Sequence, residues 1–245
     1  MNLQNQIAIV TGAGQGIGRG IAEKLNEYGA NVVVADMIES RAIETAKILE
    51  SGGGKALAVT ADISVIDDIK NMFDLCIECF GAPDILVANA GISYMNKLLE
   101  TTEEEFYKVY DVNAKGTFFC LKEAGLRLKD GGRIVLISSG TTKYPKKGMS
   151  LYSASKAAIN LMAEVAAQEL AHRKITVNCV LPGLTVTPTV EADMPDEFKQ
   201  MIINNTACGR LGVPEDIAEI VAFLCSKKSQ WINGKHILAN GGFSA

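Results

Sequence analysis

The sequence predicts a single α/β domain built on a doubly wound parallel sheet of seven strands, with helices on both faces. Two observations lead to this prediction. Short apolar runs rich in valine and isoleucine alternate along the chain with segments of helical periodicity, as in repeated strand and helix units. No linker or low-complexity segment interrupts the alternation, and 245 residues that are 48% hydrophobic suffice to bury the core of one domain.

The elements are expected in a regular order along the chain. The strands are expected at residues 7–10, 31–35, 56–60, 85–88, 133–137, 175–180 and 236–239. The helices are expected at residues 18–28, 40–50, 65–80, 103–128, 153–172 and 214–224. Thr102 and Glu105 form a capping box, and Pro214 suits a first helical turn. The irregular stretch 184–212 is expected to be a lid over a substrate site, because long loops in compact domains are usually functional or disordered.

The first expected strand leads into a turn rich in glycine. Gly12, Gly14, Gly16 and Gly18 occupy every second position of this turn. Glycine permits a tight turn, and backbone N–H groups at the start of the next helix can then meet a phosphate group. The spacing departs from the generic dinucleotide fingerprint, because Ile17 stands where its third glycine would fall. The pattern Thr-Gly-x-x-x-Gly-x-Gly therefore predicts a nucleotide-binding turn.

A tyrosine and a lysine are the main candidates for chemistry. Tyr152 and Lys156 are four residues apart, so on a helix they share one face. A neighbouring ammonium lowers the pKa of a phenol from about 10 toward the working pH, which makes a usable general base. Such a pair also arises by chance. Its agreement with the glycine turn, at the other end of the chain, and with Ser139, thirteen residues before the tyrosine, gives it weight.

Taken together with Asn89-Ala90-Gly91, Asn113 and Pro182-Gly183, these motifs resemble the short-chain dehydrogenase/reductase family over nearly the whole chain. The resemblance implies a Rossmann-type fold and hydride transfer between an alcohol and a nicotinamide. It implies that Tyr152 takes the hydroxyl proton and that Lys156 lowers its pKa and holds the nicotinamide ribose. It also implies that Ser139 hydrogen-bonds the substrate oxygen and that Asn113 kinks its helix and holds a proton-relay water.

The resemblance further implies a set of cofactor contacts along the whole chain. They are Gly12, Gln15, Gly16, Ile17, Gly18, Asp36, Asp62, Ile63, Asn89, Gly91, Tyr152, Lys156, Pro182, Gly183, Thr185 and Thr187. Asp36 closes the second strand, where an acid accepts hydrogen bonds from the adenosine ribose and repels a 2′-phosphate. Gln15 is not basic, and neither Met37 nor Ile38 is an arginine. The expected cofactor is therefore NAD rather than NADP. One departure from the family is Ala88, where many members carry a second asparagine.

Three functions are compatible with these residues. The first is an NAD-dependent dehydrogenase of a secondary alcohol, polyol, sugar, hydroxysteroid or small hydroxy compound. The second is a 3-oxoacyl carrier-protein reductase, which the segment 209–218 also resembles; Asp36 opposes its usual NADPH, and its basic docking patch would be Arg127, Lys129 and Arg173. The third is a non-catalytic NAD-binding regulator. Three lysines border the expected substrate site and either favour an anionic substrate or are solvated surface: Lys143, Lys146 and Lys147.

The composition limits the partners and the location. A net charge of −4 gives no electrostatic footprint for nucleic acid, and no run of 18 apolar residues predicts a membrane span, so we expect a cytoplasmic protein. Cys76 and Cys79 have the inner spacing of a zinc knuckle but no second ligand pair nearby, so free thiols and no metal are expected. The helices at 103–128 and 153–172 carry more small and apolar residues than one buried face needs, and family members commonly form tetramers this way; we expect a homotetramer.

Overall fold

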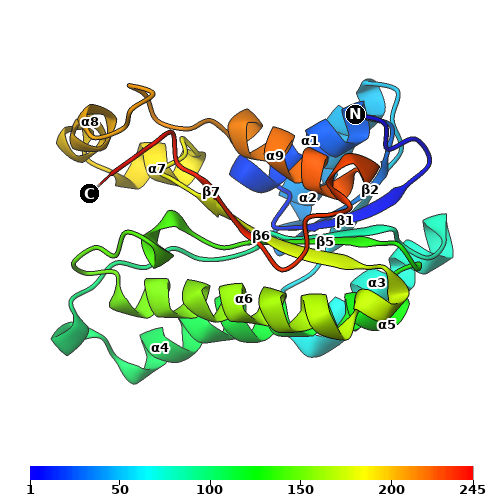
Figure 1. Ribbon diagram of the computed structural model, residues 1–245, viewed down its shortest axis with the longest axis horizontal. Coiled ribbons are helices and arrows are strands. Elements are labelled where there is room, and N and C mark those ends of the chain that lie inside the picture. Colours follow the sequence, from blue (N-terminus) through cyan, green and yellow to red (C-terminus); the bar gives the residue numbers. More distant parts are fainter. Residues whose placement is uncertain (245) are drawn as a thin grey trace.

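The structure, a computed structural model, describes residues 1–244 and contains one parallel sheet of seven strands (Figure 1). The strand order is β3-β2-β1-β4-β5-β6-β7, and every neighbouring pair is parallel. The strands are β1 (Ile7–Thr11), β2 (Asn31–Asp36), β3 (Ala56–Thr60), β4 (Ile85–Ala88), β5 (Arg133–Ile137), β6 (Thr176–Pro182) and β7 (His236–Ala239). This confirms the predicted fold class and the position of each predicted strand.

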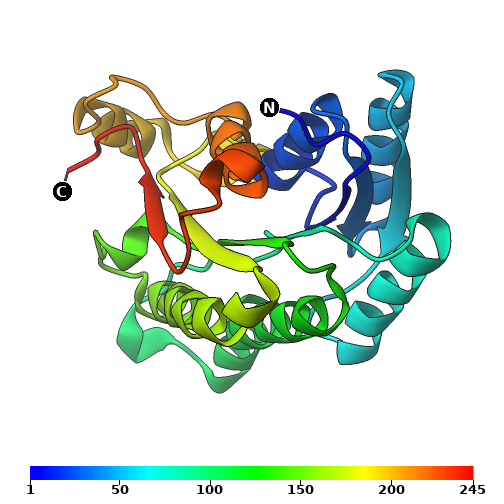
Figure 2. The same cartoon turned by 45° about the vertical axis from the view of Figure 1, so that its right-hand side comes forward.

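Helices cover both faces of the sheet (Figure 2). They are α1 (Gly16–Glu27), α2 (Glu39–Ser51), α3 (Ile66–Phe80), α4 (Glu103–Tyr110), α5 (Thr117–Arg127), α6 (Ser150–Glu169), α7 (Pro188–Asp193), α8 (Asp196–Asn204) and α9 (Pro214–Cys225). Short 3₁₀ turns occur at Leu98–Glu100, Gly140–Thr142, Ala171–Arg173 and Lys227–Ser229.

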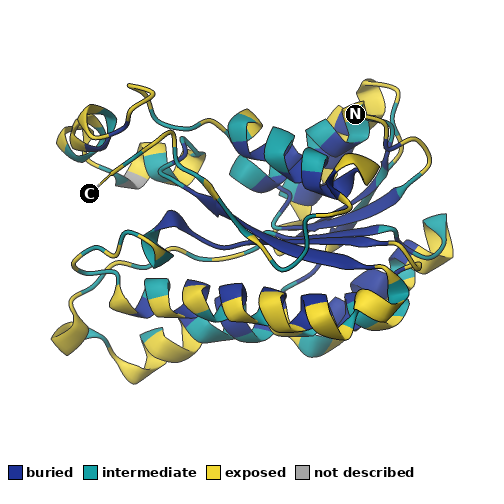
Figure 3. Ribbon diagram, viewed as in Figure 1, coloured by how far each residue is buried: buried dark blue, intermediate teal, exposed yellow. Residues whose placement is uncertain are grey.

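The sheet separates two hydrophobic cores, and Figure 3 shows the strands as the most continuously buried part of the chain. Successive side chains of a strand point to opposite faces. Ile9 therefore joins the core formed with α3, α5 and α6, while its neighbour Val10 joins the core formed with α1, α2 and α9. Burial on both faces explains why the strands are continuous apolar runs instead of alternating ones.

The predicted helix at 103–128 is interrupted. A π-helical segment, Asp111–Gly116, separates α4 from α5, and Asn113 lies inside it. The Asn113 side chain is fully buried and exchanges two hydrogen bonds with the backbone of Ile92. Such single-turn π segments often occur at functional sites. Apolar periodicity missed this one because the pattern continues through it.

The stretch 184–212 is not irregular throughout, as the sequence suggested, because α7 and α8 lie within it. Thr187 caps α7 through a hydrogen bond from the Val190 N–H, and Pro188 occupies its first turn. Both helices are short and largely exposed, so their apolar periodicity in the sequence is weak. The capping box of Thr102 with Glu105 and the place of Pro214 in the first turn of α9 are confirmed.

The order of the strands creates a switch point between β1 and β4. The chain runs outward from β1 through β2 to β3 and then returns to the other side of β1. Connections on the two sides of such a point diverge and leave a crevice at the carboxyl ends of the strands, where ligands bind in open α/β sheets. The turns after β1, β4 and β5 all open at this edge.

Candidate active site

The glycine turn after β1 has no room for a side chain at two of its glycines. A Cβ atom on Gly18 would lie 2.0 Å from the Gly12 carbonyl oxygen, and one on Gly14 would lie 2.6 Å from the Asp36 carboxylate. The first residue of the turn, Gly12, has a positive φ of 61°. The turn therefore accepts glycine alone at these two contacts, and its backbone is exposed to close approach by a ligand.

The start of α1 fits a phosphate group. Gln15 occupies the N-cap position but makes no side-chain cap, so the first N–H groups of this helix keep no side-chain partner. Asn89, at the end of β4, donates from Nδ2 to the carbonyl oxygens of Thr11 at 2.9 Å and Gly12 at 3.1 Å. The turn is thus fixed to the neighbouring strand, and the uncapped start of α1 suits the diphosphate of a dinucleotide.

Asp36 is 7% exposed and lies against this turn. Its Oδ2 accepts from the Gly14 N–H at 2.9 Å, and its Oδ1 accepts from the Ile38 N–H at 3.0 Å. Each carboxylate oxygen has a second lone pair that remains able to accept from a hydroxyl group. The same side chain can therefore anchor the glycine turn and meet a ribose.

Two arginines near this acid were not singled out from the sequence. Arg19 donates to the Gly14 carbonyl oxygen at 2.7 Å and pairs with Glu44, so its charge is compensated. Arg41 is half-buried, and its Cβ lies 2.6 Å from the position that a Cβ on Gly14 would take. No ion pair or hydrogen bond is recorded for the Arg41 guanidinium within residues 1–244. The sequence signal that could have identified Arg41 is its position five residues after Asp36, in the first turn of α2.

Other predicted cofactor residues line the same edge. Asp62 accepts from the Ser64 N–H at 2.9 Å and so closes the turn after β3, where Ile63 is buried. Thr187 lies opposite the glycine turn, since a Cβ on Gly16 would be 3.1 Å from its methyl group. Pro182 ends β6, and two further residues follow it there: Gly183, which donates to Ala239 at 2.8 Å, and Thr185, whose hydroxyl donates to the Gly183 carbonyl at 3.1 Å.

The structure brings Ser139 and Tyr152 together. Ser139 follows β5, and its hydroxyl oxygen accepts from the Thr141 N–H at 3.2 Å and from the Thr141 hydroxyl at 3.0 Å. Tyr152 lies in the first turn of α6 and is half-buried. Burial raises the pKa of the Tyr152 phenol, and a hydrogen bond with the Ser139 side chain opposes that rise. The two hydroxyl groups are therefore coupled.

Lys156 is buried one turn after Tyr152 in α6. Its ammonium donates to the Ile137 carbonyl oxygen at 3.0 Å, and burial lowers its own pKa to about 8. The group that lowers the pKa of Tyr152 in this arrangement is Ser139. Spacing along a helix places Lys156 on the right face but does not reveal which carbonyl its ammonium selects.

Asn113 completes the group. Its Oδ1 accepts from the Ile92 N–H at 2.9 Å, and its Nδ2 donates to the Ile92 carbonyl at 3.0 Å and to the Ser155 hydroxyl at 3.1 Å. Ser155 in turn donates to the Tyr152 carbonyl oxygen at 2.7 Å. A Cβ on Gly91 would lie 2.9 Å from the Lys156 ammonium and 3.1 Å from Asn113 Oδ1. All four predicted catalytic residues and Gly91 thus converge at one place.

A cluster of aromatic side chains around Lys146 lies at the end of the neighbouring loop. The Lys146 ammonium is 4.5 Å from the ring centroid of Phe243 and 5.3 Å from that of Phe198 on α8. The Tyr144 ring meets Phe243 edge to face, with centroids 6.0 Å apart. We call these four residues the aromatic clasp. Sequence reasoning missed its aromatic members, because they come from three separate segments.

The described residues show neither a cluster of metal ligands nor a membrane-spanning helix. Among the side chains that the structure describes, no three His, Cys, Asp or Glu are grouped as metal ligands would be. In the same part of the chain no helix has the length and apolar character needed to cross a bilayer. The six cysteines are free, and burial raises the pKa of Cys76 to about 12.

Comparison with known proteins places this geometry in context. The profile of the family described as Enoyl-(Acyl carrier protein) reductase matches residues 12–244. The Aspergillus aculeatus protein named short chain dehydrogenase/reductase AacuN is 40% identical over 98% of this chain and 96% of its own length. The Metarhizium brunneum protein named hydroxynaphthalene reductase-like protein Arp2 is 36% identical over 98% of this chain and 96% of its own length. A crystal structure of a dehydrogenase/reductase from Sinorhizobium meliloti 1021 superimposes with a TM-score of 0.95 at 37% identity, covering 100% of this chain and 97% of that one.

Proposed function

The chain belongs to the short-chain dehydrogenase/reductase family, and from this premise we propose that it is an NAD-dependent oxidoreductase of a secondary alcohol and its ketone. The observation that carries the proposal is the convergence of Ser139, Tyr152 and Lys156 beside a phosphate-binding turn. A non-catalytic NAD-binding regulator would have no need for a coupled pair of hydroxyl groups at this point.

The proposed chemistry follows from the side chains. The nicotinamide, when bound, accepts the hydride. Tyr152 takes the hydroxyl proton of the alcohol, and Ser139 donates a hydrogen bond to the substrate oxygen, where negative charge develops. Lys156 holds the nicotinamide ribose and supplies positive charge one turn from the phenol. Asn113 keeps the π-helical segment open beside them and holds a water for proton relay.

The preference for NAD is supported by the surroundings of Asp36. The carboxylate is held by two backbone N–H groups at the position where an adenosine ribose would lie. A 2′-phosphate there would meet a like charge, which costs several kcal/mol. Arg41, which has no ion pair or hydrogen bond among the described residues, lies beside it and sets a limit to the discrimination.

We further propose that residues 1–245 act as one dinucleotide-binding and catalytic domain and that 184–212 is its substrate lid. The Cys208 N–H donates to the Gly241 carbonyl at 3.0 Å, which joins the end of this stretch to the C-terminal segment. Figures 1 and 2 show that C-terminal segment beside α8. The aromatic clasp then joins both to the loop before Tyr152. Because the clasp is aromatic, it favours a substrate with a flat apolar body, such as a hydroxysteroid, over a sugar.

A second candidate is a reductase of carrier-protein thioesters, which the description of the matching family profile favours. Asp36 opposes the NADPH that such an enzyme would use. Its docking patch would also have to be basic, yet the three cations at the expected place are compensated. Arg127 pairs with Asp74 and Glu123, Lys129 pairs with Asp84, and Arg173 pairs with Asp130.

We also propose that the protein is a cytoplasmic homotetramer. The helices α5 and α6 leave large apolar side chains exposed in the described part of the chain: Phe118 is 48% exposed, Leu161 62% and Val165 46%. Pairing of these helices across a two-fold axis would bury them. Light scattering at micromolar concentration reads the assembly, and a monomer would contradict it.

The proposed function is tested by Tyr152→Phe, which keeps the ring and removes the only proton acceptor. Turnover is expected to fall by roughly 10²–10⁴-fold while NADH still binds. The assay follows NADH absorbance across alcohols, polyols, steroids and 3-hydroxyacyl thioesters, with NAD and NADP in parallel. Near-normal turnover of the variant would remove Tyr152 from the chemistry.

A further inference from the structure

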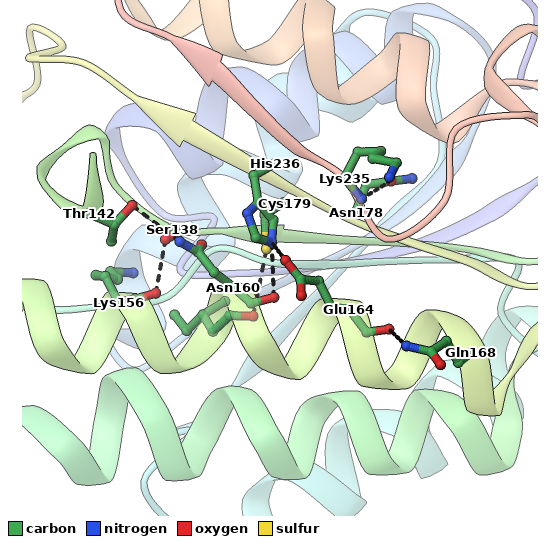
Figure 4. Close-up of polar contacts among 11 residues, drawn as sticks. Ser138, Thr142, Lys156, Asn160, Glu164, Gln168, Asn178, Cys179, Lys235 and His236 are labelled. Atoms are coloured by element: carbon green, nitrogen blue, oxygen red, sulfur yellow. Dashed lines mark hydrogen bonds and ion pairs between the residues drawn. The ribbon is translucent and has the colours of Figure 1, made fainter. Parts of the chain in front are cut away.

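The helix α6 carries a third polar side chain in line with the two catalytic ones. Tyr152, Lys156 and Asn160 follow one another at intervals of four residues, so they share one face. Asn160 is only 9% exposed. Figure 4 shows it one turn beyond Lys156, with its side chain directed toward Thr142 in the turn after β5.

Asn160 connects α6 to the turn that carries Ser139. Its Nδ2 donates to the Thr142 hydroxyl oxygen at 3.2 Å, and that hydroxyl donates to the Ser139 carbonyl oxygen at 2.8 Å. The same carbonyl accepts from the Thr142 N–H at 3.2 Å. Two hydrogen bonds in sequence thus run from the helix of Tyr152 to the backbone of Ser139.

The chemistry of the amide fixes the direction of this path. The Thr142 hydroxyl has one proton, and it reaches Ser139 only if the partner on its other side donates. The Asn160 NH₂ group is such a donor. Its Oδ1 is buried without a hydrogen-bond partner within residues 1–244, so the contact with Thr142 is the hydrogen bond that this side chain makes there. Burying an amide oxygen without a partner costs stability, so we look for a role of Asn160 in holding its neighbours in place.

The charged neighbours of Asn160 do not replace this contact. The His236 Nε2 on β7 lies 3.1 Å from the Asn160 backbone carbonyl oxygen and 3.2 Å from the Glu164 carboxylate, one turn farther along α6 (Figure 4). Lys156, one turn back, donates to Ile137. None of these groups reaches Thr142, so the link to Ser139 depends on the Asn160 side chain.

We propose that Asn160 is a positioning residue for the reaction: through Thr142 it holds the Ser139 turn at a fixed distance from the Tyr152 phenol. The proposal rests on the proposed function, because that distance matters only if Ser139 and Tyr152 perform the chemistry. A catalytic group displaced by about 1 Å can lose 10²-fold in rate. Loosening the turn also weakens the Ser139 hydrogen bond that holds the pKa of Tyr152 down.

The experiment removes each hydrogen bond with a side chain of similar size. In Asn160→Leu and in Thr142→Val, kcat/KM is expected to fall about tenfold while the Kd for NADH stays unchanged. In alcohol oxidation the limb of the pH profile that belongs to Tyr152 is expected to move to higher pH, because the phenolate form becomes harder to reach. The double variant is expected to be no worse than either single one, since both break one path.

Two variants serve as controls. Thr142→Ser keeps the hydroxyl group, so its rate and its pH profile are expected to match those of the unaltered protein. Gln168→Leu changes a side chain two turns beyond Asn160 whose recorded contact is a hydrogen bond to the Glu164 carbonyl, and it is expected to leave both unchanged. A melting temperature for each variant separates a loss of stability from a loss of position.

Several results would overturn the proposal. An unmoved pH limb in both Asn160→Leu and Thr142→Val, or fully additive rate losses, would leave Asn160 with a packing role only. If Asn160→Leu does not fold, the comparison of Thr142→Val with Thr142→Ser decides alone. Tyr152→Phe in the same assay keeps the two hypotheses apart. An active Tyr152→Phe variant defeats the proposed function. If Tyr152→Phe is inactive but the pH limb does not move in Asn160→Leu and Thr142→Val, only this inference is defeated.

Discussion

The turn that would hold the cofactor and the mouth of the substrate site differ in how tightly their contacts hold them. The turn is fixed by hydrogen bonds between two side chains and its backbone and by close packing: Asn89 ties it to β4, Asp36 ties it to β2, and close contacts exclude a Cβ at Gly18. The mouth is held by fewer contacts at the surface, a lysine over two rings and a backbone hydrogen bond from Cys208 to Gly241 in the C-terminal segment. The first arrangement tolerates few substitutions, while the second can change at small cost in stability. Cofactor use is therefore the conservative property of this chain, and substrate choice is the adjustable one.

The largest expected effect is that of Gly18→Ala. A Cβ 2.0 Å from the Gly12 carbonyl cannot be accommodated without moving the turn, so NADH binding is expected to be lost and stability to fall by about 3 kcal/mol or more. Gly53→Ala is the matched control, because its φ of +85° is strained but a Cβ there meets nothing within 4 Å. It is expected to cost about 1–2 kcal/mol and to leave NADH binding intact. Calorimetric titration with NADH and thermal melting measure both effects, and equal losses in the two variants would show that the close packing at Gly18 has no special weight.

The next effect concerns cofactor choice. The unaltered protein is expected to prefer NAD over NADP at least about a hundredfold in kcat/KM, which is roughly 2.7 kcal/mol. Asp36→Ala with Met37→Arg is expected to erode or invert this preference, because it removes a like charge and adds a planar donor for a phosphate.

Two further variants sharpen that test. Asp36→Asn keeps an acceptor for the Gly14 N–H, so it separates loss of repulsion from loss of the anchor. Arg41→Ala is expected to lower any residual use of NADP. Equal kcat/KM values for both cofactors in the unaltered protein would mean that Asp36 serves the turn alone, and the carrier-protein reductase would become the leading candidate.

A smaller effect is expected from Lys156→Met, and it concerns the pH dependence of the protein's stability. The pKa of Lys156 is about 8 in the folded protein against 10.5 ordinarily, so the unfolded chain binds more protons between these pH values. Stability from this group therefore rises with pH from about 8 to 10.5, and below pH 8 the buried charge is a full cost. The inactive Lys156→Met variant should then melt higher than the unaltered protein at pH 7, and the difference should vanish near pH 10.5. A higher melting point that persists unchanged at pH 10.5 would contradict this, and Lys147→Met, at an exposed position, is the control.

The smallest effect is expected at the aromatic clasp. Lys146→Met removes the cation above Phe198 and Phe243, each contact being worth about 0.5–1 kcal/mol at an exposed site. The KM for a substrate that turns over is expected to rise about three- to tenfold, with kcat and the Kd for NADH unchanged. Lys143→Met changes an exposed lysine on the same loop and should leave KM alone. A drop in kcat with constant KM would place Lys146 in the chemistry instead of the mouth.

The sequence predicted the strands and the glycine turn because short-range patterns specify them. Valine and isoleucine runs predict buried parallel strands. The sequence did not predict the side-chain contacts between segments that are far apart along the chain. The family resemblance implied a kink at Asn113, but nothing in the sequence indicates that Asn113 meets Ile92, that Lys156 selects the Ile137 carbonyl or that Asn160 reaches Thr142. These contacts depend on the packing of α6 and of the α4–α5 segment against the sheet, which periodicity does not encode.

The strand order also bears on how the protein is made. The central strand β1 pairs with β2 and with β4, so the turn at Gly12 lacks its Asn89 anchor until the ribosome has delivered about the first third of the chain. From then on, β3, β2, β1 and β4 can form a partial sheet while the strands that carry Ser139 and the lid are still to be synthesised. Domains fold as units during synthesis, and parallel pairing between distant segments is slow and leaves edges open. The exposed edge of β4, which later receives β5, is therefore the surface that a nascent chain must protect from wrong partners.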